Sequence, residues 1–117
     1  MNLYKLHSEP TKLLKYKELH NIIDEEIIIS ALSDINNIST ADWDDIFYKL
    51  EKFVLKHGRN RNIEQAILYT DNAEFMAQFA NYILNTRWYD AEYAIAQDAE
   101  ALDAYTEHFG IDKHELI

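Results

Sequence analysis

The clearest hydrophobic pattern in the chain runs from residue 40 to residue 57. Apolar side chains recur there at the i, i+3, i+4, i+7 and i+11 positions that share one face of an α-helix: Trp43, Ile46, Phe47, Leu50 and Val54. Gly58 follows directly, and glycine commonly ends a helix because it adopts a left-handed backbone without strain. The pattern predicts a long amphipathic helix over residues 40–57 with one buried face.

Two earlier segments also carry helix signals. Pro10 suits the first turn of a helix over residues 10–20, where its missing N–H removes no hydrogen bond. Asp24 is the predicted N-cap of a second helix, which contains the mostly apolar segment 27–32 and ends near residue 36.

The second half of the chain predicts two further long helices. Asp71 and Glu74 form a capping-box-like start for an apolar stripe made of Phe75, Phe79, Tyr82 and Ile83. Asp98 opens the last long helix, in which Leu102, Tyr105 and Phe109 share one face before Gly110 ends it. Asp112 can start one more turn in the tail.

An internal repeat links these helices. Residues 59–67 and 87–95 both read Arg, four residues, Glu, one residue, Ala-Ile, at an offset of 28. A period of this length is typical of stacked helical repeats, in which each unit buries its apolar face on the next. We therefore expect a single all-α domain over 1–117, built as a small solenoid of two-helix repeats or as an irregular helical bundle. Its parts are capping helices at 1–39, repeat-like units at 40–110 and a tail at 111–117.

Composition supports this fold class. Only two glycines and one proline occur among 117 residues, too few for the tight turns of an all-β domain. There is no cysteine, which excludes disulfides and thiolate metal sites and is compatible with a reducing compartment. The longest run of branched aliphatic residues, 27–29, is far shorter than a membrane span. We expect a cytoplasmic protein with no membrane association.

Two segments carry a family resemblance. The opening residues 3–10 and the unit 87–98, which reads Arg-Trp-x-x-Ala-Glu-x-x-Ile-x-x-Asp, resemble a group of tailed-bacteriophage α-helical repeat proteins. The similarity covers most of residues 3–109 and is clearest over 71–105. The group often has proline where this chain has Tyr89, so the chain resembles a divergent member. The resemblance implies a phage origin, the host cytoplasm as location and a helical-repeat fold, but no activity.

Charge suggests what such a protein would bind. The net charge is −10, and residues 62–117 hold eleven acids against two bases. Helix geometry predicts that five of these acids are exposed and form an acidic face: Glu74, Asp90, Glu100, Asp103 and Glu107. Such a surface repels nucleic acid and attracts basic proteins. The leading hypothesis is therefore an interaction protein that mimics DNA and inhibits or redirects a host nuclease or other DNA-binding defence factor, as anti-restriction and anti-CRISPR proteins do.

Three other interpretations remain open. A basic stripe, Lys49, Lys52, Lys56 and Arg59, could bind an anion or could simply be a solvated helix face. The aromatic residues Trp88, Tyr89 and Tyr93 could anchor a protein partner or could belong to the core, where Trp88 would wedge between helices. A structural role through homo-oligomerisation of the repeats is the alternative function, and an enzyme acting on nucleotides or nucleic acid ranks lowest.

The sequence contains no recognisable catalytic apparatus. No histidine pair has the i, i+4 spacing of a helical zinc site, and no glycine-rich phosphate loop is present. The acid clusters at 24–26 and 42–45 lie in predicted first helical turns, where the helix dipole favours carboxylates. We therefore expect no enzyme activity, no metal and no cofactor.

Overall fold

The computed structural model describes residues 24–117, and every regular element among them is helical. Residues 24–32 are helical and are followed by two 3-10 turns. The later elements are α3 (Trp43–His57), α4 (Arg61–Tyr69), α5 (Ala73–Gln78), the π-helical segment η3 (Phe79–Leu84), α6 (Tyr89–Ile95), α7 (Ala99–Phe109) and the 3-10 turn η4 (Lys113–Glu115). The all-α prediction is confirmed for this part of the chain. The helix predicted over 10–20 lies outside the described residues.

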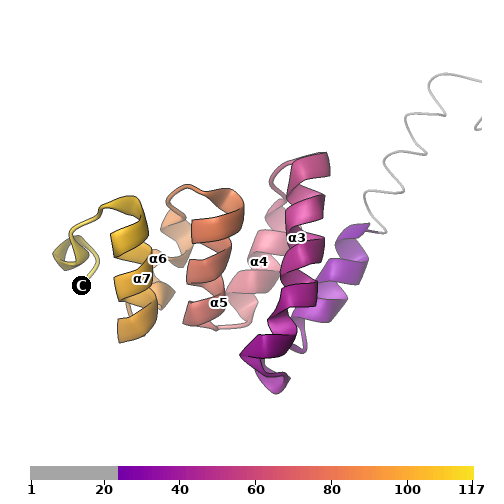
Figure 1. Ribbon diagram of the computed structural model, residues 1–117, viewed down its shortest axis with the longest axis horizontal. Helices are drawn as coiled ribbons and strands as arrows, with labels where there is room; N and C mark the ends of the chain where they lie inside the picture. The colour runs from indigo at the N-terminus through magenta and orange to yellow at the C-terminus, as the bar shows by residue number, and fades with distance from the viewer. Residues whose placement is uncertain (1–23) are drawn as a thin grey trace, which may run out of the picture.

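Long and short helices alternate along the chain and occupy different layers. Figure 1 shows α3, α5 and α7 side by side toward the viewer, with α4 and α6 behind them. Residues 24–117 form an elongated body with principal extents of 57 × 28 × 19 Å. Each helix therefore packs mainly on elements close to it in the sequence.

Helix α3 has the predicted amphipathic character. Asp44 and Asp45 lie in its first turn, where carboxylates complement the helix dipole. Its buried side chains are Trp43, Ile46, Leu50 and Phe53. Phe47 and Val54 are only half-buried, because the side of the helix that carries Leu50 and Phe53 faces the core most directly. Gly58 ends the helix as predicted, with a φ of +80° and its N–H donated to the carbonyl of Val54 at 2.8 Å.

The start of α5 differs from the prediction by one residue. Asn72 is the N-cap, and its Oδ1 accepts the N–H of Phe75 at 3.0 Å. Asp71 instead has a φ of +53° in the turn that ends α4. Asp24 also differs from its predicted capping role, because it is itself helical.

The predicted ends of α7 are confirmed. Oδ1 of Asp98 accepts the N–H of Ala101 at 3.0 Å, and Gly110 ends the helix with a φ of +65°. Asp112 caps η4 by accepting the N–H of His114 at 3.0 Å.

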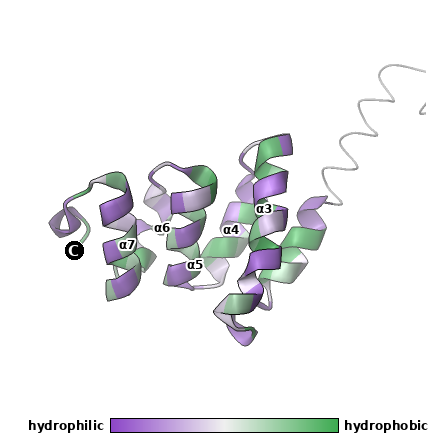
Figure 2. Cartoon of the chain, viewed as in Figure 1, coloured by the Kyte–Doolittle hydropathy of each residue, from purple (hydrophilic) through white to green (hydrophobic). Residues whose placement is uncertain are grey.

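Aromatic side chains connect the layers through the core. Phe75 contacts Trp43 edge-on at a centroid distance of 5.2 Å and stacks on Phe47 at 4.6 Å. Phe79 contacts Trp88 at 5.3 Å. Figure 2 shows hydrophobic and hydrophilic residues alternating around the long helices, as expected for helices with one buried side. Each buried large side chain of this kind contributes about 1.5–3 kcal/mol to stability.

One helix departs from α-helical geometry. The α5 helix continues into η3, where the backbone hydrogen bonds are of the i→i+5 type, and ends at Asn85 in the left-handed conformation with a φ of +50°. Asn81 lies in the middle of this segment and is only 3 % exposed. The π-helical segment therefore places an amide side chain in the interior.

Candidate functional site

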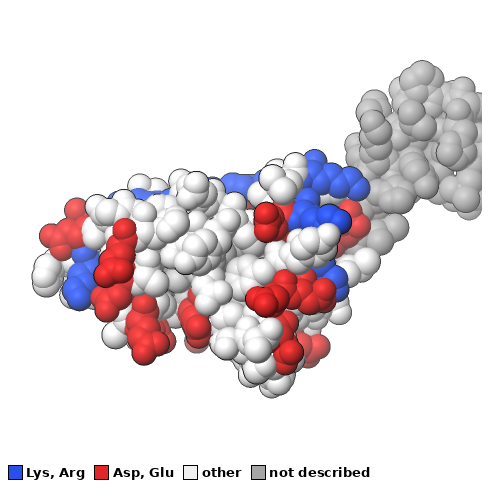
Figure 3. Space-filling view, viewed as in Figure 1, with Lys and Arg blue, Asp and Glu red and all other residues white. Residues whose placement is uncertain are grey.

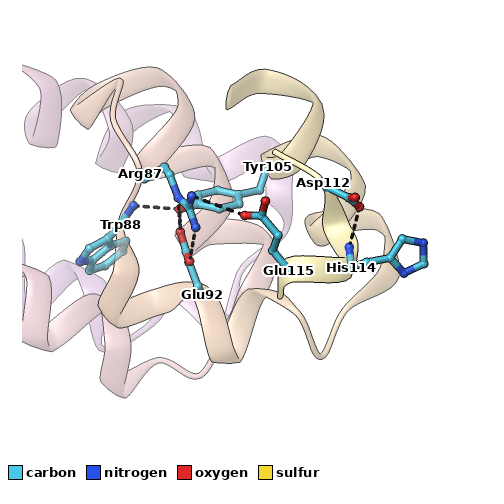
Figure 4. Close-up of polar contacts among 7 residues, drawn as sticks. All are labelled: Arg87, Trp88, Glu92, Tyr105, Asp112, His114 and Glu115. Carbon is cyan, nitrogen blue, oxygen red and sulfur yellow. Dashed lines mark hydrogen bonds and ion pairs between the residues drawn. The ribbon is translucent and has the colours of Figure 1, made fainter. Parts of the chain in front are cut away.

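The most buried polar cluster joins α6 to α7. The guanidinium of Arg87 donates two hydrogen bonds to the carboxylate of Glu92, both at 2.9 Å (Figure 4). The hydroxyl of Tyr105 donates to Oε2 of Glu92 at 2.5 Å and accepts the backbone N–H of Trp88 at 2.9 Å. Glu115 approaches the same guanidinium at 4.0 Å.

The electrostatics of this cluster fix its protonation state. The hydrogen bonds from Arg87 lower the pKa of Glu92, and the bond from Tyr105 acts in the same direction. Burial, together with the hydrogen bond to Glu92, raises the pKa of Tyr105 to about 12. The hydrogen bond to Glu92 raises the pKa of Arg87. The carboxylate is therefore charged and the phenol neutral at physiological pH.

This cluster is suited to holding helices together rather than to acid–base catalysis. Glu92 is 8 % exposed and Tyr105 is completely buried, so neither oxygen is accessible to a substrate. General acid–base catalysis needs a group within hydrogen-bonding reach of the substrate. The network instead links the turn before α6 to α7.

A second pair repeats this geometry one unit earlier. Arg59 donates to Glu64 through Nε at 3.0 Å and through Nη2 at 2.6 Å. In both pairs the arginine precedes the N-cap and the glutamate is the fourth residue of the short helix, so the pairs lie at the offset of 28 found in the sequence. The repeated residues thus join the turn before each short helix to the first turns of that helix. Within the described residues, only the second pair also binds a tyrosine.

The five residues of the acidic face are all exposed, as helix geometry predicted. Glu74 lies on α5, whereas Glu100, Asp103 and Glu107 lie on α7. Asp90 lies on α6, in the other layer, and close enough to Arg59 for its charge to help raise the pKa of that guanidinium. Asp90 is therefore set apart from the other four.

Few basic residues compensate the four carboxylates on α5 and α7. Asp103 pairs with Lys113 at 3.2 Å, whereas the other three make no ion pair within residues 24–117. Figure 3 shows acidic side chains at the α7 end and along the lower edge of the molecule as far as the lower part of α3, and a cluster of basic side chains on the upper part of α3.

The basic stripe, which runs along α3 to Arg59 just beyond its end, is exposed but largely paired. Lys49 contacts Asp45 at 3.1 Å, Lys56 contacts Asp24 at 3.9 Å and Arg59 binds Glu64. Lys52 lies over the ring of Tyr48 at 4.9 Å. Three of its four cations thus already have a carboxylate partner, which weakens the attraction of the stripe for an external anion.

The aromatic candidates separate into core and surface. Trp88 is only 2 % exposed, so the interpretation of this residue as a surface anchor is wrong. Its ring packs on Phe79, because the turn before α6 points it into the interior. Tyr89 and Tyr93 are 69 % and 82 % exposed and remain available to a partner.

The sequence interpretation missed a groove between α5 and α7. Its volume is about 280 Å³, and Asn81 lies in its wall with Glu74 and Glu100 nearby. A signal was present, because Asn81 is a single amide within the otherwise apolar or aromatic run 79–84. Burial of such a group without hydrogen bonds is costly, so an isolated amide in a buried stripe points to a local polar role.

Within residues 24–117, no three His, Asp or Glu side chains lie close enough together to hold a metal ion. No helix in the same range is both long and apolar enough to cross a membrane. Comparisons with protein-family models, with curated proteins and with solved structures found no match to the chain.

Proposed function

We propose that this protein is a small acidic interaction protein of phage type. It binds a host protein through carboxylates on α5 and α7 and blocks or redirects that protein's DNA-binding surface in the host cytoplasm. In this proposal the alternating helices are two-helix repeats whose stacking displays the carboxylates along one side.

The supporting observation is the shortage of compensating charge on α5 and α7. Glu74, Glu100 and Glu107 are exposed and have no ion pair within the described residues. Unpaired exposed carboxylates contribute little to folding. They do create a field that attracts a basic surface over several ångströms and speeds its association. The phage resemblance favours a host protein as the owner of that surface.

A matched pair of variants tests this proposal. The first variant carries Glu74→Gln, Glu100→Gln, Asp103→Asn and Glu107→Gln. The control carries four exposed substitutions elsewhere: Glu26→Gln, Asp34→Asn, Asp44→Asn and Glu51→Gln. Both variants change the net charge from −10 to −6, because each replaces four acids. Only the location of the lost charge differs.

Affinity capture from a bacterial lysate is then compared for the wild type and both variants. We expect the first variant to lose its partner and the control to keep it. The wild type should also displace DNA from the captured protein, and salt should weaken capture steeply. Equal capture by the two variants would show that the acidic face is not the binding surface.

The alternative function is assembly through homo-oligomerisation. The observation that favours it is the set of exposed tyrosines on the short helices, Tyr69, Tyr89 and Tyr93, which are 69–86 % exposed. Tyrosine is enriched at protein interfaces. Sedimentation at increasing protein concentration tests this alternative, because an oligomer of this kind forms without a host partner and resists salt.

A further inference from the structure

The side chain of Asn81 has an unused hydrogen-bond acceptor. Its Nδ2 donates to the carbonyl of Ala104 at 3.3 Å, which fixes the orientation of the amide. Its Oδ1 accepts no hydrogen bond and exposes less than 1 Å². Leaving a buried acceptor unpaired costs about 1–3 kcal/mol, so such atoms are rare in folded proteins. An acceptor of this kind is suited to a donor that arrives from outside the chain.

The surroundings of Asn81 select a cationic donor. The groove that Asn81 lines also contains the carboxyl-bearing residues Glu74, Asp98 and Glu100, and no basic residue. Asp98 uses Oδ1 to cap α7, which leaves its other oxygen for a ligand. Glu74 accepts only a long hydrogen bond of 3.4 Å from Gln78 within the described residues. Three carboxylates and one amide oxygen thus make the described groove rich in acceptors, and its side-chain donors are the amides of Gln78 and Asn81 and the hydroxyl of Tyr82.

The shape of the groove favours a guanidinium over an ammonium group. The alanines at 77, 101 and 104 line the groove with small side chains, and its volume of about 280 Å³ admits a flat group on an extended side chain. A guanidinium is planar, carries five N–H donors and is more weakly hydrated than an ammonium, so it loses less on entering such a slot. The exposed ring of Tyr82 at the rim adds an aromatic surface on which a guanidinium can stack.

We propose that the groove between α5 and α7 binds one arginine side chain of a partner protein, with Asn81 Oδ1 accepting a guanidinium N–H and Glu74 and Glu100 balancing its charge. This inference rests on the proposed function for the existence of a basic partner, and it goes beyond that function by naming a discrete receptor. Because Asn81 Oδ1 exposes less than 1 Å², binding of the arginine requires the groove to widen at this oxygen.

The test uses the full chain and three peptides. A capped pentapeptide with a central arginine is titrated against the protein, and lysine and citrulline peptides of the same length serve as comparisons. Citrulline keeps the shape of arginine but has no charge. Binding and the position of the Asn81 side-chain amide resonances are followed by NMR. We expect the arginine peptide to bind most tightly, with the Asn81 resonances among the most strongly shifted.

Variants locate the binding. Asn81→Leu and Glu100→Gln should each weaken the arginine peptide by about tenfold, because each removes an acceptor from a charged donor. Glu107→Gln, on the same helix but outside the groove, should change the affinity by less than about twofold. Ala104→Phe fills the groove from its exposed rim and should abolish binding of the arginine peptide without changing the core. This variant therefore tests the groove even if Asn81→Leu fails to fold.

Two outcomes overturn the inference. Equal binding of the arginine and citrulline peptides would exclude recognition of a guanidinium. Equal loss in Glu100→Gln and Glu107→Gln, with Ala104→Phe unaffected, would mean that charge acts diffusely, which leaves the proposed function intact without a receptor groove. The proposed function can also fail separately. If the wild type binds the arginine peptide in the groove but the four-site variant still captures the host partner, only the proposed function is refuted.

Discussion

Replacing Tyr105 with phenylalanine removes one oxygen atom from the contact between α6 and α7 and leaves the ring in place. The backbone N–H of Trp88 would lose its acceptor inside the core, and Glu92 would lose one of its donors. An unpaired buried donor costs about 1–3 kcal/mol, and a hydrogen bond to a charged group contributes about 1.5–3 kcal/mol. Because Arg87 still binds Glu92, the two losses do not add fully. We expect Tyr105→Phe to lower the free energy of unfolding by about 2–4 kcal/mol.

This loss is large beside the total stability of a small domain, about 5–15 kcal/mol. Urea unfolding followed by circular dichroism measures it, and the midpoint should fall by about 1–2 M for a typical dependence on denaturant. Tyr93→Phe is the control, because that side chain is 82 % exposed and its loss should change stability by less than about 0.5 kcal/mol. If the two variants unfold at the same urea concentration, the Tyr105 hydroxyl does not hold α6 to α7.

Two further predictions concern charge. Glu92 has a lowered pKa, so its contribution to stability is complete above 4.5, the ordinary pKa of a glutamate, and is lost as pH falls through the lower pKa of the folded state. The stability difference between the wild type and Glu92→Gln should therefore narrow below that pH in urea titrations, and a constant difference would contradict the assignment. Reversal of Lys49, Lys52 and Lys56 to Glu should change stability by a few tenths of a kcal/mol per site and leave partner capture intact. Lost capture by a folded variant would instead make the basic stripe the binding surface.

Much of the helical pattern could be predicted because local chemistry determines it. The stripe along α3 follows from periodicity, and Gly58 and Gly110 end helices because they adopt positive φ at no steric cost. The N-cap of α5 was missed by one position, because Asp71 and Asn72 are adjacent and both are good capping residues. The sequence alone does not show which of the two is the N-cap, because the conformation of the preceding turn determines which side chain reaches the first N–H groups of the helix.

The contacts within the candidate sites were less accessible to prediction. The repeat pointed to Arg87 and Glu92, but the third member of the cluster, Tyr105, comes from another helix and is brought there by packing. Tryptophan is common both in cores and at protein interfaces, and Trp88 lies in the core. Its location depends on the direction in which the turn before α6 points the side chain. The unpaired oxygen of Asn81 likewise depends on a π-helical segment that has no periodic signature.

That π-helical segment has a consequence for how the chain tolerates changes in length. The continuous helix from Ala73 to Leu84 has twelve residues, six in α5 and six in η3, whereas α7 has eleven. An extra residue in a regular α-helix would rotate everything after it by about 100°. A wider i→i+5 turn takes up an extra residue locally, so the residues beyond such a turn keep their alignment with the core. Arg87 and Trp88 therefore still meet α7, and deleting one residue from 79–84 should restore an ordinary helix while closing off Asn81.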